Sequence, residues 1–162
     1  MEGFATFKRK YPDDPHKLVQ KKKKGFQFEE AEMTIANHKL EGEVVVLDWL
    51  PEEDVALLMN GAELFVFPSL YEGFGIPVLE AMSCGTPVVC SNTSSLPEVA
   101  GEAAIKFNPE KVDAIVKAIE TVIFNPEIRE ALVAQGLAQA KKFSWQRTAE
   151  DTLKIINKVK LV

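Results

Sequence analysis

The sequence predicts an α/β domain whose mainly parallel, doubly wound sheet carries helices on both faces. Short apolar runs of strand length alternate with helical patterns along the chain, and the connections between them are short. The composition, 46% hydrophobic and 27% charged, is typical of a globular protein. At 162 residues the chain has room for one core, so we expect residues 1–162 to form a single domain.

The first part of the chain predicts two helices and two strands. Residues 1–11 place phenylalanines among charges and stop at a proline, which indicates the end of an amphipathic helix. Residues 16–20 predict a short strand that the lysine run 21–24 interrupts. Residues 29–40 carry apolar side chains at helical spacing, and residues 44–47 are a clear buried strand.

The rest of the chain continues the alternation. Pro51 and the acidic residues after it predict a helix start. The further predicted strands are residues 64–67, 87–90 and 103–107, and the further predicted helices are residues 76–83, 108–123, 125–142 and about 145–159. Gly85 follows the helix 76–83 at the position where a left-handed residue ends a helix, and Ser144 is suited to cap the last one.

Charge and residue content exclude several classes of function. A net charge of −5 argues against a nucleic-acid partner. No apolar run reaches the length of a membrane span, and the first residues do not resemble a signal peptide, so we expect a cytoplasmic protein. Cys84 and Cys90 have no disulfide or metal-ligand spacing, and we interpret both as buried thiols in a reducing compartment.

A glycine-containing loop after the strand 64–67 predicts an anion site. Gly73 and Gly75 allow the backbone to turn sharply and to approach a ligand closely. The helix that follows offers unpaired N–H groups and the positive end of its dipole, and Pro77 is compatible with a first helical turn. A phosphate or diphosphate is therefore the expected ligand.

Two carboxylates flank this loop. Glu72 would repel a phosphate that it faced directly, so it fits better beyond the phosphate, accepting hydrogen bonds from sugar hydroxyls. Glu80 lies about one turn into the helix, where it suits the two hydroxyls of a ribose. The pattern outlines a nucleoside-diphosphate sugar. The alternative is a common Gly-x-Gly turn with Glu80 as a solvated surface residue.

Residues 67–89 read FPSLYEGFGIPVLEAMSCGTPVV, and this stretch resembles the signature of retaining glycosyltransferases with the GT-B fold, family 4 type. The resemblance extends through the segment 94–99 and the Phe143–Ser144–Trp145 stretch, from about residue 44 to residue 160. It implies that Glu72 contacts the donor sugar in catalysis, because it matches the first glutamate of the family's pair. The second, Glu80, would hold the ribose.

The resemblance also implies the remaining donor contacts. The backbone of Gly73, Phe74, Gly75 and Ile76 would hold the sugar and diphosphate, and Trp49 or Leu50 would flank the base. The family needs no metal, and we expect no other cofactor, since the nucleotide sugar is a substrate.

Family members have a second, acceptor-binding domain and a first strand with cationic residues, and we expect neither in this sequence. We therefore consider an acceptor-domain subunit as a partner, and a peripheral membrane context through that missing half. Some lysines of the run 21–24 could serve a phosphate, but we favour a solvated basic turn as the interpretation of most of them.

Other residues have structural interpretations. His16 and His38 have no evident partner and are interpreted as surface residues. Glu98 follows another strand and either faces the ligand or starts a helix. Trp145 is interpreted as a core anchor, and the apolar stripe of the last helix, left partly exposed, favours self-association.

Two functions therefore remain open. The first is an enzyme component that transfers a glycosyl group from a nucleotide sugar to a sugar or lipid-linked acceptor, with retention of configuration. The second is an inactive or regulatory nucleotide-sugar-binding module. Half of a sugar-nucleotide epimerase is a further rival, whereas a receiver-like domain lacks its acidic cluster.

Overall fold

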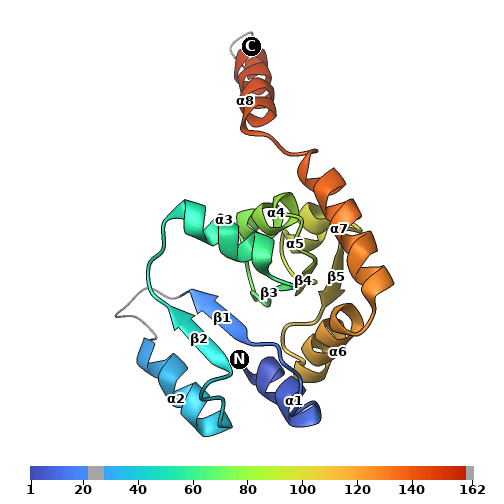
Figure 1. The fold of residues 1–162 in the computed structure, drawn as a ribbon. Helices are drawn as coiled ribbons and strands as arrows, with labels where there is room; N and C mark the ends of the chain where they lie inside the picture. Colours follow the sequence, from blue (N-terminus) through green and yellow to red (C-terminus); the bar gives the residue numbers. More distant parts are fainter. Residues whose placement is uncertain (22–27, 160–162) are drawn as a thin grey trace.

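The structure is a computed structural model that describes residues 1–21 and 28–159 (Figure 1). The strands are β1 (Leu18–Lys21), β2 (Val44–Leu47), β3 (Phe65–Phe67), β4 (Val88–Ser91) and β5 (Ala104–Phe107). The helices are α1 (Glu2–Lys10), α2 (Phe28–His38), α3 (Glu52–Gly61), α4 (Ile76–Ser83), α5 (Leu96–Ala100), α6 (Val112–Ile123), α7 (Pro126–Ala140) and α8 (Trp145–Val159). The predicted α/β class is confirmed, and most predicted boundaries agree within two residues.

The strands form two parallel sheets. β1 pairs with β2, and β3, β4 and β5 form a three-stranded sheet in that order. We expected one sheet, but among the described residues no ladder joins β1 to β3. The order β2-β1 followed by β3-β4-β5 is the doubly wound order 3-2-1-4-5-6 without its first strand.

Helices cover both faces of the three-stranded sheet. All four residues of β4 are buried, and its alternate side chains enter two apolar clusters. Val88 and Cys90 pack with residues of α4 and α5, while Val89 packs with residues of α6 and α7. Burial raises the pKa of the Cys90 thiol to about 11. Cys84 is only partly buried, so the prediction of two buried thiols is confirmed for Cys90 alone.

The predicted amphipathic helix at the start of the chain packs against α6. Phe7 is buried, and its ring stacks on Phe124 with centroids 6.0 Å apart. Tyr11 meets the same ring edge-on at 4.8 Å. Lys10 forms an ion pair of 2.7 Å with Glu120 of α6. These contacts attach the segment leading to β1 to the three-stranded sheet and its helices.

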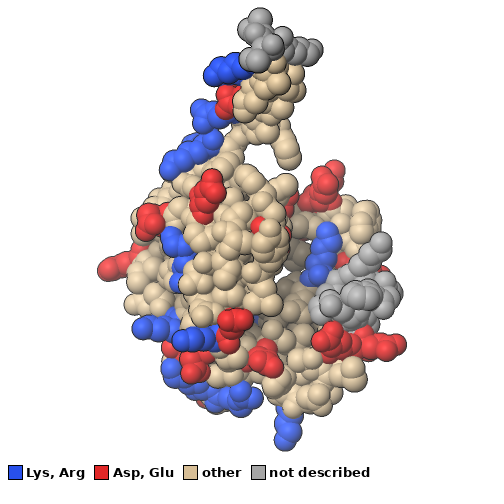
Figure 2. Space-filling model, turned by 180° about the vertical axis from the view of Figure 1, so that it is seen from behind, with Lys and Arg blue, Asp and Glu red and all other residues tan. Residues whose placement is uncertain are grey.

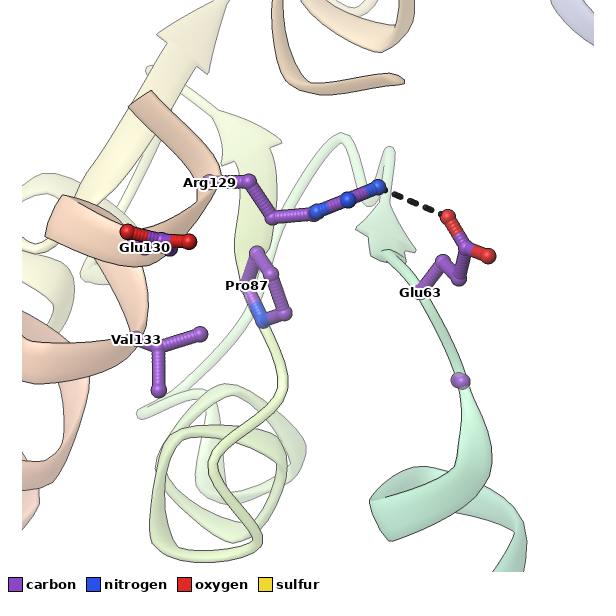
Figure 3. A pocket seen from close by; sticks show the side chains of 6 residues that line it. Glu63, Pro87, Arg129, Glu130 and Val133 are labelled. Atoms are coloured by element: carbon purple, nitrogen blue, oxygen red, sulfur yellow. Dashed lines mark hydrogen bonds and ion pairs between the residues drawn. The ribbon is translucent and has the colours of Figure 1, made fainter. Parts of the chain in front are cut away.

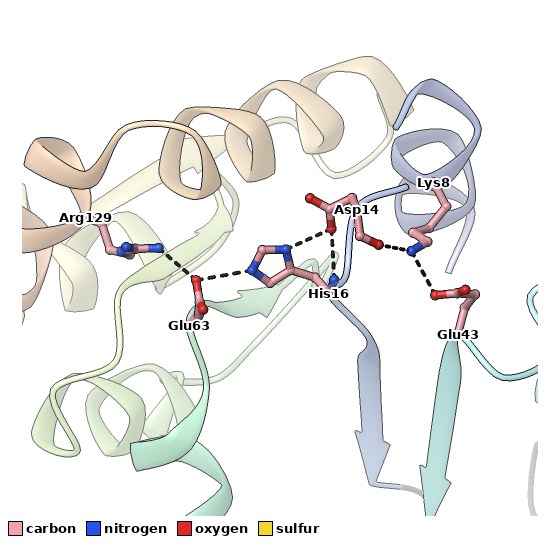
Figure 4. Close-up of polar contacts among 6 residues, drawn as sticks. All are labelled: Lys8, Asp14, His16, Glu43, Glu63 and Arg129. Atoms are coloured by element: carbon pink, nitrogen blue, oxygen red, sulfur yellow. Dashed lines mark hydrogen bonds and ion pairs between the residues drawn. The ribbon is translucent and has the colours of Figure 1, made fainter. Parts of the chain in front are cut away.

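A chain of ionic side chains joins the two sheets at the starts of β1 and β3 (Figure 4). His16 places Nδ1 2.8 Å from Asp14 and Nε2 3.2 Å from Glu63, and Arg129 of α7 donates to the same Glu63 oxygen at 2.8 Å. His16 precedes β1 and Glu63 precedes β3. The prediction that His16 has no partner is therefore wrong: Asp14 contacts it from two residues earlier, and the fold brings Glu63 to it from 47 residues later.

This contact makes stability depend on pH. Burial lowers the pKa of His16, but its hydrogen bonds to Asp14 and Glu63 outweigh that effect and raise the pKa above 6.5. The stabilisation is therefore complete below that pH and is lost as the pH rises through the folded-state pKa. We expect the melting temperature to fall between about pH 6 and 8. In His16→Gln, thermal melts at a series of pH values should show a smaller fall of the melting temperature with pH. An equal fall in both proteins would contradict the assignment of this pH dependence to His16.

The structure adds or corrects details in the C-terminal half. The short helix α5 was not predicted as an element, although Glu98 does lie in its first turn. α6 begins at Val112, later than expected. Ser144 caps α8 as predicted, since its Oγ accepts a hydrogen bond of 3.1 Å from the Arg147 amide.

α8 projects away from the rest of the molecule (Figure 1). Trp145 is 80% exposed, so its interpretation as a core anchor is wrong. No residue of α8 is buried, and Leu153, Ile155, Ile156 and Val159 are all exposed. A capped helix start predicts where the helix begins but not whether its apolar side is covered.

The surface carries mixed charge. Acidic and basic side chains are interspersed over the face shown in Figure 2. Across residues 1–21 and 28–159, every helix is too short or too polar to cross a bilayer. Residues 22–24 of the lysine run, which we considered as phosphate ligands, lie outside the described part of the chain.

Candidate functional site

The predicted site residues lie in loops at the carboxyl ends of the strands. Residues 68–75 connect β3 to α4, residues 92–95 connect β4 to α5, and residues 48–51 connect β2 to α3. β3 and β4 are parallel neighbours, so the first two loops leave the same edge of the same sheet. This is the edge at which open α/β sheets bind ligands.

Gly75 forms the N-cap of α4 in a conformation that favours glycine. Its φ is +106°, and it is buried. A Cβ at this position would lie 2.6 Å from Cδ2 of Leu96, which is fully buried in the core. Gly75 is therefore needed both for the turn and for the close packing of α5 beneath it.

The glycine amides of this loop are left without partners. Among the described residues, the N–H groups of Gly73 and Gly75 donate no hydrogen bond. The α4 helix begins directly afterwards, with Pro77 in its first turn, as predicted. Unpaired amides at the positive end of a helix form a ready site for an anion.

Hydroxyl groups of the neighbouring loop hold this loop in place. Ser94 Oγ accepts a hydrogen bond of 3.0 Å from the Glu72 amide. Ser95 Oγ lies 3.0 Å from the carbonyl oxygen of Glu72 and 2.7 Å from that of Phe74, within reach of both as a donor. Thr93 adds a bond of 3.3 Å to the Ser69 carbonyl. Sequence reasoning did not find these contacts, since they join segments more than twenty residues apart.

The two glutamates keep their carboxylates available. Glu72 is half-buried and Glu80 is exposed. Within the described part of the chain, neither carboxylate has a hydrogen-bond or ion-pair partner. Glu80 follows the Gly75 N-cap by five residues, just over one helical turn into α4. One unpaired carboxylate thus precedes the unpaired amides in the sequence, and the other follows them.

The apolar residues of the predicted site are all at least partly exposed. Phe74 is 46% exposed and meets the Phe143 ring edge-on, with centroids 5.9 Å apart. Ile76 is 43% exposed at the start of α4. Trp49 is 71% exposed and Leu50 is half-buried, and both follow β2 in the other sheet. The proposed base contacts and donor contacts thus come from different sheets.

A pocket of about 340 Å³ lies at the opposite edge of the sheet (Figure 3). Pro87 and Glu63 line it just before β4 and β3, together with Arg129 and Val133 of α7. Its cation is already paired, because Arg129 donates to Glu63 at 2.8 Å. The pocket therefore lies away from the glycine loop and offers no unpaired cation to an anionic ligand.

The described residues contain no group of three or more His, Cys, Asp or Glu side chains that could hold a metal ion. The carboxylates of the segment 68–80 are Glu72 and Glu80, eight positions apart. A sugar hydroxyl or a ribose diol, which donates hydrogen bonds, is the chemical group that such isolated carboxylates suit.

Known proteins resemble this chain closely in sequence. O-antigen chain mannosyltransferase B of Escherichia coli is 50% identical over 113 residues, which cover 70% of this chain and 30% of that protein. MMP alpha-(1->4)-mannosyltransferase of Mycolicibacterium hassiacum is 38% identical over 113 residues, which cover 67% of this chain and 28% of that protein. The chain therefore spans about a third of the length of these curated relatives.

Solved structures share the fold. Sucrose-phosphate synthase from Thermosynechococcus elongatus matches 99% of this chain with a TM-score of 0.86 and 22% identity, over 42% of its own chain. Anabaena Alr3699/HepE in complex with UDP matches 96% with a TM-score of 0.83 and 20% identity, over 44% of its chain. These matches support the Rossmann-like half of a GT-B fold.

The family model described as glycosyl transferases group 1 matches residues 18–139. That range includes β1 to β5, the glycine loop and both glutamates. The chain belongs to the glycosyl transferases group 1 family.

Proposed function

We propose that this chain binds a nucleoside-diphosphate sugar and forms the donor half of a retaining, family 4 type glycosyltransferase. The transferred group is a hexose, and the names of the relatives at 38–50% identity favour mannose. The acceptor is a sugar or a lipid-linked sugar. Membership of the family supports the reaction class, and the loop after β3 supports donor binding.

One observation carries this proposal. The unpaired amides of Gly73 and Gly75 lie at the start of α4, with the unpaired carboxylates of Glu72 and Glu80 before and after them. The amides suit the diphosphate, Glu80 suits the ribose hydroxyls, and Glu72 suits the transferred sugar. Phe74 and Ile76 contribute backbone and apolar contacts, while Trp49 or Leu50 flanks the base.

The proposed chemistry depends on position and charge. The nucleoside diphosphate is the leaving group, and negative charge develops on it as the glycosyl bond breaks. The loop amides and the α4 dipole stabilise this charge. Glu72 stabilises positive charge that develops at the anomeric carbon of the sugar. The proposed reaction uses no metal ion and no other cofactor.

A second candidate is a donor-binding module that works only with a separate acceptor-domain subunit. The observation that favours it is that the site residues described above are all on the donor side, in the loops after β2, β3 and β4. In that case the chain binds donor but turns over only when the other half is added. We also propose that the chain self-associates through α8, because the apolar side chains of this helix are exposed.

A thermal-shift titration tests donor binding. UDP-, GDP- and ADP-sugars, with the matching free nucleotides, are titrated against the 162-residue chain. Preferential binding to the folded state raises the melting temperature as the ligand concentration increases. At a ligand concentration of a hundred times Kd, the free energy of unfolding increases by about 2.7 kcal/mol. If no sugar nucleotide shifts the melt or gives heat in calorimetry, donor binding by this chain is refuted.

A further inference from the structure

The loop that holds the predicted donor contacts depends on two serines for which family membership gives no role. Ser94 and Ser95 end the connection between β4 and α5, next to the glycine loop. Ser94 has a φ of +52°, a conformation that costs an L-residue about 1–2 kcal/mol and that glycine adopts without that cost. A non-glycine residue held there points to a use for its side chain.

Within residues 1–21 and 28–159, the other non-glycine residue with positive φ has a local explanation, and Ser94 does not. Lys39, with φ +55°, directly follows α2, where left-handed residues commonly end helices. Ser94 precedes α5 instead. Its Oγ accepts the Glu72 amide at 3.0 Å, which fixes the backbone of the residue proposed to face the sugar.

Ser95 fixes the direction of the glycine amides. Its hydroxyl lies within 3.0 Å of the Glu72 carbonyl and 2.7 Å of the Phe74 carbonyl, so both carbonyls point toward Ser95. The described chain has no cis peptide bond. In a trans peptide each N–H points opposite to the preceding carbonyl, so the amides of Gly73 and Gly75 both point away from Ser95.

We propose that Ser94 and Ser95 are positioning residues for the donor site. Ser94 sets the backbone of Glu72, and Ser95 aims the Gly73 and Gly75 amides in a common direction, toward the diphosphate. This inference rests on the proposed function, because it assigns a role within the same site. The loop would otherwise have to be ordered by the ligand, and donor affinity would fall by that cost.

Four variants separate positioning from folding. Ser94→Gly removes the hydroxyl but relieves the left-handed strain, so its melting temperature should equal or exceed that of the unmodified chain. Ser95→Ala removes the donor, and Ser95→Thr retains it. Ser83→Ala, at the exposed end of α4, is the matched control.

Binding is measured by calorimetry with inorganic diphosphate and with each sugar nucleotide of the panel. We expect Ser94→Gly and Ser95→Ala to weaken binding by about five- to tenfold, as for one lost hydrogen bond of about 1 kcal/mol. Ser95→Thr should restore binding, and Ser83→Ala should leave it unchanged. Amide exchange at Glu72 should become faster in Ser94→Gly but not in Ser83→Ala.

The outcomes are distinguishable from failure of the proposed function. If the unmodified chain binds no probe, the proposed function fails and this inference fails with it. If that chain binds but Ser94→Gly and Ser95→Ala bind equally well, only the positioning role is overturned. Failure of Ser95→Thr to restore binding would show that the Ser95 hydroxyl is not the group responsible.

Discussion

Gly75→Ala should lower the free energy of unfolding by about 2–5 kcal/mol, the largest stability effect that we expect from one added methyl group. The φ of +106° disfavours any L-residue. The new Cβ would also lie 2.6 Å from Cδ2 of Leu96, whose side chain is fully buried and would have to shift within the core. Urea unfolding followed by circular dichroism measures the loss.

Gly73→Ala is the matched control for that variant. Gly73 is only two residues away, but a Cβ there meets no atom within 4 Å and its φ is not in the left-handed region. We expect its stability to stay within about 0.5 kcal/mol of the unmodified chain. Equal losses in the two variants would contradict the packing of Gly75 on Leu96.

Glu80→Gln should weaken binding of the nucleotide sugar by about 10- to 100-fold, because hydrogen bonds to a charged group are each worth about 1.5–3 kcal/mol. The neutral amide of glutamine accepts hydrogen bonds from a ribose diol less strongly than a carboxylate does. Stability should be unchanged, since Glu80 is exposed and its carboxylate has no partner among the described residues. Isothermal titration calorimetry with the best ligand of the panel measures the effect.

Two comparisons sharpen that experiment. Glu130→Gln removes the same charge from α7, beside the pocket at the opposite edge of the sheet, and should leave affinity unchanged. Titration with the free base lacking ribose should show no difference between Glu80→Gln and the unmodified chain. Unaltered affinity of Glu80→Gln for the complete nucleotide sugar would remove Glu80 from the ribose contact.

Much of the fold could be predicted because its signals are local. The strand 44–47, the helix 76–83 and the cap at Ser144 each depend on apolar spacing, a proline or a hydroxyl within one element. The glycine loop was equally clear, since its residues are consecutive. Their roles in binding a donor stay predictions.

The features that sequence reasoning missed depend on contacts between distant segments. His16 gains its partner Glu63 from a position 47 residues later. Ser95 reaches the Glu72 and Phe74 carbonyls across more than twenty residues. Trp145 is exposed because the part of the chain that the structure describes offers nothing to cover α8. Such facts follow only from the assembled fold.

The division into two sheets has a consequence for cooperativity. β4 is buried along its whole length, whereas every residue of β1 and β2 is at least partly exposed and α3 has no buried residue. Local opening therefore costs less free energy in the β1–β2 pair than in the β3–β5 sheet. A ligand spanning Trp49 and Glu80 would couple the two units, so part of its intrinsic affinity would be spent on suppressing independent opening. Amide protection would then increase most in the less stable unit, remote from the diphosphate.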